Sequence, residues 1–157
     1  MIRATILLSG LLLLSGCVSA PQKSEDYSKL ALSDGELLQD KWQGLNRTAA
    51  IYPLQAAQSR TSGCATVEYV ITPEYQIRNL IVTEASNRVF NKSAKAVVSR
   101  WDWSGLPKGL LSAPVKTQTR FNYCIESEDI SCAEVMERFS CSGDDSLAAI
   151  GSIVKQG

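Results

Sequence analysis

The stretch that decides the fold is CATVEYVIT, residues 64–72, in which apolar and polar side chains alternate. Every second side chain would lie on one face of an extended strand, and these are Ala65, Val67, Tyr69 and Ile71. Residues 73–76 (PEYQ) have the composition of a turn, and residues 77–84 are again rich in β-forming side chains. The pattern predicts a half-buried strand joined by a turn to a second strand.

A helix and a third strand follow. Ser86-Asn87 can cap a helix start, and the apolar residues after it recur at helical spacing: Phe90, Ala94, Val97, Val98 and Trp101. Gly105 and Pro107 end this pattern, and residues 115–123 (VKTQTRFNY) alternate once more. One helix across the apolar face of a three-stranded antiparallel sheet predicts a two-layer α+β fold.

The order of these features resembles the C-terminal domain of the TonB family of energy transducers over residues 48–125. The resemblance is carried by Tyr52-Pro53, by Gly63-x-x-x-Val67-x-Tyr69-x-Ile71 and by Trp101-x-Trp103. It implies that the first strand is central and that a short segment of an outer-membrane receptor lies alongside the third strand. The implied peptide-binding edge contains Tyr52, Pro53, Lys116, Gln118 and Arg120. The alternative is that the C-terminal tail covers this edge.

The N-terminus has the form of an export signal. A basic start, MIR, precedes an uncharged run over residues 4–15, which is shorter than the ~20 apolar residues of a bilayer-spanning helix. Leu14-Ser15-Gly16-Cys17 resembles the lipobox of bacterial lipoproteins. We therefore expect a signal peptide at residues 1–16, a lipidated Cys17 and a tether to residue 47 with a short helix near 35–44. The alternative is a buried N-terminal helix.

The residue after the lipidated cysteine bears on where the protein resides. It is Val18 rather than Asp, and in well-studied lipoprotein sorting systems Asp at this position resembles a retention signal for the inner membrane. We expect the protein at the periplasmic face of the outer membrane, held by the lipid on Cys17. Two or more acyl chains give stable anchoring, because each buried CH₂ group contributes ~0.8 kcal/mol to membrane binding.

Without Cys17, four cysteines remain, and an even set in an oxidising compartment predicts disulfides. If Cys64 lies opposite Cys124 on adjacent strands, Glu68 faces Arg120 and apolar residues meet on the helix face. A one-residue shift would mix the two faces. We therefore expect the pairs Cys64–Cys124 and Cys132–Cys141. Two other pairings, or two free buried thiols, remain open.

Residues 126–157 form an acidic tail with two short helical patterns, the second carrying Leu147, Ile150 and Val154. The tail holds seven Asp/Glu against two Lys/Arg, whereas residues 52–124 hold nine Lys/Arg against four Asp/Glu. The tail could fold back on the basic domain, or the two could present separate faces. Asp144-Asp145 lacks the alternating ligands of a calcium loop, so we expect both side chains in solvent.

Composition excludes several functions. The chain has no His, which removes Ser-His-Asp and Cys-His catalysis and imidazole metal sites. Its net charge of zero gives no general attraction to nucleic acid. We predict no enzyme activity and no cofactor. The predicted function is a lipid-anchored module that binds an envelope protein by strand addition, with a link to TonB-type transport. The alternative is an accessory subunit of an envelope assembly that binds through its tail.

Overall fold

The structure, a computed structural model, describes residues 26–128 and 131–152. The predicted signal peptide, Cys17, residues 18–25 and Val154 lie outside the described residues. The described chain holds the strands β1 (Gly63–Ile71), β2 (Ile77–Ala85), β3 (Val115–Glu126) and β4 (Ser146–Ser152). Its α-helices are α1 (Leu54–Gln58), α2 (Asn91–Val98) and α3 (Cys132–Met136). Three 3₁₀ turns complete it: η1 (Glu36–Leu38), η2 (Asp40–Trp42) and η3 (Arg88–Phe90).

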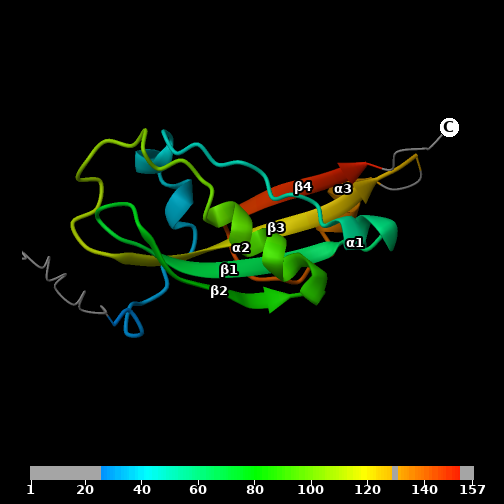
Figure 1. The fold of residues 1–157 in the computed structure, drawn as a ribbon, viewed down its shortest axis with the longest axis horizontal. Coiled ribbons are helices and arrows are strands. Elements are labelled where there is room, and N and C mark those ends of the chain that lie inside the picture. The colour runs from blue at the N-terminus through cyan, green and yellow to red at the C-terminus, as the bar shows by residue number, and fades with distance from the viewer. Residues whose placement is uncertain (1–25, 129–130, 153–157) are drawn as a thin grey trace, which may run out of the picture.

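The strands form one sheet in the order β2-β1-β3-β4 (Figure 1). β1 is central to the predicted part and is antiparallel to both β2 and β3, which confirms the α+β class and the expected place of the first strand. The prediction of three strands is wrong, because β4 pairs with β3 as a fourth. β4 runs parallel to β3, so a crossover connection is needed, and residues 127–145 supply it.

The prediction of two helices in the tail is also wrong. α3 is helical, but Leu147 and Ile150 lie in β4. A short apolar run fits a helical and an extended period equally well. The neighbouring β3 edge, whose backbone groups need partners, favours the extended form.

α2 packs across one face of the sheet, as predicted (Figure 1). Asn87 caps the turn that leads into it by accepting a hydrogen bond from the Val89 N–H at 3.0 Å. The expected apolar stripe is buried in full. At its start the Phe90 ring stacks on the Tyr123 ring of β3, with centroids 4.4 Å apart. This layer is therefore the part of the fold that the sequence pattern describes most closely.

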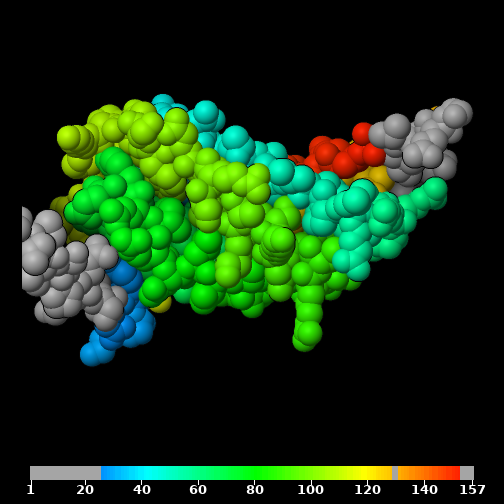
Figure 2. Space-filling model, viewed as in Figure 1, coloured from blue at the N-terminus to red at the C-terminus, as the bar shows by residue number. Residues whose placement is uncertain are grey.

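The N-terminal segment packs against the same side of the molecule. Its turns η1 and η2 fall where a short helix was expected, and Leu37, Trp42 and Leu45 are buried in the core. The Trp42 ring lies edge-on to Trp103 at 5.9 Å. Figure 2 shows the segment, in cyan, beside α2 on this face. Of the stretch predicted as a tether, residues 26–47 thus belong to the folded body.

The opposite face of the sheet is crossed by residues 131–145, which we term the strap. Thr66 Oγ1 of β1 donates to the Ser142 carbonyl at 2.5 Å, and the Arg120 guanidinium of β3 donates to the Cys141 carbonyl at 3.1 Å. β1 is consequently buried on both faces, with Glu68 its one partly exposed residue. Its alternation suggested a strand with one face in solvent, because a covering segment remote in sequence leaves no local signal.

Both disulfides join the sheet to the strap. Cys64 bonds to Cys141, and Cys124 bonds to Cys132. All four cysteines are paired, but the predicted pairs Cys64–Cys124 and Cys132–Cys141 are wrong.

The error has a physical origin in the register of β1 and β3. The strands are offset by two residues from the predicted alignment, so Cys64 faces Asn122, Glu68 faces Gln118 and Thr66 faces Arg120. A shift of two keeps every side chain on its own face, so alternation cannot select between these alignments. Glu68 instead lies diagonally near Lys116, with Oε1 3.8 Å from Nζ.

The pairing can be checked by tryptic mapping without reduction. Cleavage after Lys and Arg places one cysteine in peptide 61–78, two in 121–138 and one in 139–155. We expect 61–78 linked to 139–155, and 121–138 closed on itself with the mass of an intrapeptide disulfide. Both other pairings would join all three peptides in one species, and its detection as the main product would refute the observed connectivity.

Candidate functional site

The outer edge of β3 is the site that the sequence analysis favoured, and its first half is covered by the N-terminal segment. Leu32 forms a parallel bridge with Lys116, and the Ser33 N–H donates to the Lys116 carbonyl at 2.8 Å. Thr117 Oγ1 donates to the Ser33 carbonyl at 2.8 Å. The Gln118 side-chain amide donates to Asp34 Oδ2 at 2.9 Å.

The second half of the same edge is covered by β4. Seven residue pairs, from Arg120–Ser146 to Glu126–Ser152, align β3 with β4. Just before them, the Arg120 N–H donates to the Asp145 carbonyl at 2.8 Å. Lys116, Gln118 and Arg120 therefore contact this chain's own segments. The expectation of an open β3 edge is therefore wrong. The alternative was that the C-terminal tail covers this edge, and β4 of the tail does so.

Glu36 holds the N-terminal cover in place. Its side chain is buried, with Oε1 2.6 Å from Lys41 Nζ and accepting from the Trp42 indole at 3.1 Å. Oε2 accepts from Ser33 at 3.0 Å, next to the residue that bridges to β3. Burial opposes ionisation of this carboxyl, but Lys41, Trp42 and Ser33 outweigh it, and the pKa of Glu36 is lowered. Its contribution to stability is therefore present above about pH 4.5 and is lost as the pH falls further.

Asp145 holds the start of β4. Its side chain is fully buried, and both of its oxygens accept from Arg47 Nη1, at 2.7 and 2.8 Å. Thr119 Oγ1 of β3 donates to Oδ2 at 2.7 Å, and Thr119 is hydrogen-bonded in turn to the buried Tyr69 hydroxyl at 2.8 Å. Burial raises the pKa of Tyr69. The Arg47 guanidinium also lies over the Trp101 ring, 5.7 Å from its centroid.

Sequence reasoning missed this group. Asp145 was expected in solvent beside Asp144, and that expectation is wrong for Asp145, whereas Asp144 is exposed. Arg47 was assigned to a tether. Neither residue stands in a pattern that marks burial, and they are 98 positions apart, so no local signal could have identified their contact.

Tyr52 does lie against the terminal strand of the sheet, β4, whereas Pro53 is the residue that precedes α1. A side chain on Gly151 of β4 would begin 3.1 Å from the Tyr52 ring, so glycine lets the ring lie against the strand. The Tyr52 hydroxyl donates to the Thr61 carbonyl at 2.5 Å. Next to this ring in sequence, Ile51 and Leu54 are among the most exposed large apolar residues described. The predicted Tyr-Pro segment thus borders β4 rather than a free β3.

The two terminal strands of the sheet differ sharply. β2 pairs with β1 through two register shifts, contains Asn79 at φ 47° and carries the charges of Arg78 and Glu84. Bulges and charges are devices that protect an edge. β4 has the sequence SLAAIGS, with no charge and no proline, pairs without a shift, and leaves Ile150 59% exposed. Among the described residues, none forms a backbone hydrogen bond with its outer edge.

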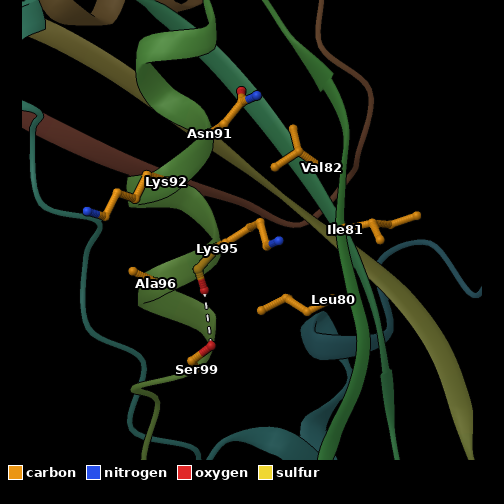
Figure 3. A pocket seen from close by; sticks show the side chains of 8 residues that line it. All are labelled: Leu80, Ile81, Val82, Asn91, Lys92, Lys95, Ala96 and Ser99. Carbon is orange, nitrogen blue, oxygen red and sulfur yellow. Dashed lines mark hydrogen bonds between the residues drawn. The ribbon is translucent and has the colours of Figure 1, made fainter.

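A groove of about 650 Å³ lies between α2 and β2 (Figure 3). Leu80 and Val82 point toward the helix, whereas Ile81 points away. Lys92 and Lys95 line it from α2, and no acidic residue does. The groove offers apolar surface and positive charge beside the protected edge, but its lining contains no acid–base pair or thiol.

In the described part of the chain, the domain is a four-stranded sheet with α2 on one face and β4 as a terminal strand. Residues 48–125 match the family described as Gram-negative bacterial TonB protein C-terminal and form a domain of that family. Domains of this family are interaction and energy-transduction modules of the bacterial envelope rather than enzymes. No curated protein and no solved structure gives a match to the chain.

The family boundaries show where the covers of β3 come from. Residues 32–34 and β4 both lie outside the matched range of 48–125. The edge that the family resemblance assigns to a partner is therefore closed by segments added at both ends of the domain. Among the described residues, no helix is long and apolar enough to span a membrane.

The buried ion pair gives a stability prediction. Replacing Asp145→Asn leaves Arg47 without its counter-ion, and removal of one partner of a buried pair costs roughly 3–5 kcal/mol. Because Arg47 is 21% exposed, we expect the lower end, about 3 kcal/mol, in the free energy of unfolding by urea. Asp144→Asn is the matched control, with an expected change of about 0.5 kcal/mol or less. Equal losses in the two variants would contradict the role of Asp145.

Proposed function

We propose that this protein is a lipid-anchored binding module of the bacterial envelope that takes up an extended segment of an envelope protein along the outer edge of β4. The observation that carries the proposal is that β4 is the unprotected end of the sheet, on the same side where the family resemblance implies a partner strand. An added strand gains main-chain hydrogen bonds from the edge and selects its side chains by alternate pockets.

The surroundings of β4 support this placement. On the α2 face, the Tyr52 ring extends the apolar surface up to Gly151. On the strap face, Ile150 is 59% exposed at the edge. Because successive side chains of a strand point to opposite faces, a partner strand with an apolar residue on each face would meet both of these groups. The accessory-subunit alternative assigned binding to apolar tail helices with Leu147, Ile150 and Val154; the first two of these residues lie in β4.

Lipidation at Cys17 would set where such a partner can be. Nine peptide units connect Cys17 to Asp26, the first described residue, and a chain spans at most ~3.6 Å per residue. Asp26, where the described body begins, would then lie within about 32 Å of the leaflet that holds the acyl chains. We therefore propose a partner segment exposed at the periplasmic face of the outer membrane, such as part of a receptor in TonB-type transport.

The anchor is tested by fractionating cells that express the full chain or its Cys17→Ser variant. We expect the unaltered protein in outer-membrane fractions and retarded in migration when lipoprotein signal processing is blocked with a globomycin-type inhibitor. The serine variant should leave the outer membrane and show no response to the inhibitor. Identical behaviour of the two proteins would refute lipidation at Cys17.

The binding edge is tested by cross-linked capture from envelope membranes with two matched variants. Ile150→Lys introduces a charge at the β4 edge and should abolish recovery of the partner, because an edge lysine opposes strand addition. Ile81→Lys makes the same change on β2, where isoleucine is 49% exposed, and should leave recovery unchanged. Urea midpoints of both variants establish that they are folded. Loss with Ile81→Lys alone would move the site to β2.

A further inference from the structure

We propose that β4 also pairs with β4 of a second copy of this chain, in antiparallel orientation about a two-fold axis at Ala149. The inference rests on the same edge as the proposed function and names a second partner for it. Its starting point is that none of the described residues pairs with the outer edge of β4, and that β4 itself has no charge, proline or register shift to oppose self-association. Strands of this kind are templates for pairing with another chain.

Symmetry restricts how two such strands can meet. A two-fold axis that makes the strands antiparallel stands perpendicular to the sheet, so the α2 faces of both copies lie on the same side. Directly opposite residues must then come from the same face. Centred on Ala149, the alignment uses all seven residues of β4 and places Ser146 opposite Ser152, Leu147 opposite Gly151 and Ala148 opposite Ile150.

In this alignment each large side chain meets a small one. On the strap face, exposed Ile150 lies beside exposed Ala148 of the second copy, twice by symmetry. On the α2 face, Leu147 lies beside Gly151, where the absence of a side chain leaves the Tyr52 ring within reach. An alignment centred on Ile150 would instead oppose two isoleucines and leave Ser146 and Leu147 without a partner within β4.

The resulting dimer is closed. Its interface is isologous, and it joins two four-stranded sheets into one that ends in β2 on both sides. Those ends carry the register shifts and charges that oppose further addition. Pairing therefore stops at two copies, and an envelope segment that binds β4 must displace the second copy.

Register-specific cross-linking in envelope membranes tests the pairing. Full-length chains that carry Ala148→Cys or Ile150→Cys, with different affinity tags, are co-expressed and treated with a short thiol-specific cross-linker. Opposite residues of an antiparallel pair have Cβ atoms roughly 4.5–5.5 Å apart, so we expect the mixed 148–150 product to exceed both 148–148 and 150–150 products several-fold. Ile81→Cys on β2 is the matched control and should give no dimer above background.

The outcomes separate this inference from the proposed function. Absence of the mixed product in folded variants, or equal yields from all cysteine positions including 81, would overturn the dimer. If Ile150→Lys still abolishes capture of an envelope protein in that case, the proposed function stands. If the mixed product forms but no envelope protein is captured, the dimer stands and the proposed function fails.

Discussion

The contact on which the rest of the structure depends is the buried carboxylate of Asp145. This carboxylate accepts hydrogen bonds from Arg47 in the N-terminal segment and from Thr119 in β3. The backbone carbonyl of Asp145 accepts from the Arg120 N–H where β4 begins. One residue thus ties both ends of the described chain to the central sheet. Detaching β4 would also expose Arg47 and Asp145. Because a buried charge without its partner is strongly unfavourable, the cover over β3 is held as part of the core.

The predicted β1–β3 register is wrong by two residues, and this error separates what the sequence can predict from what it cannot. Periodicity located three strands, α2 and its apolar stripe because each depends on neighbours a few positions apart. Alternation excluded odd shifts but could not separate Cys64 opposite Cys124 from Cys64 opposite Asn122. In the observed register each sheet cysteine bonds to a cysteine of the strap on the far face, Cys64 to Cys141 and Cys124 to Cys132. Contacts of this range have no local pattern.

The candidate site moved for the same reason. Lys116, Gln118 and Arg120 were assigned to a free edge from the family resemblance, which covers only the segment 48–125. The segments outside it determine what that edge contacts. Tyr52 kept its association with a sheet edge because the ring packs against Gly151, one strand further out. The zero net charge of the chain likewise conceals an acidic strap that lies directly on the basic domain, with Arg120 bonded to Cys141 and Glu84 to Ser142.

The contrast between β2 and β4 at the two ends of the sheet favours β4 as the strand that binds a partner. A terminal strand that serves only to complete a fold is made safer by bulges and charges, and β2 has both. β4 was added beyond the family domain, closes an edge that would otherwise be open, and yet presents a new edge without either device. An addition made only to protect β3 would gain from a lysine at Ile150, which is exposed and carries no core packing role there. Retaining an apolar, regular edge is physically consistent with a strand that is occupied by a partner.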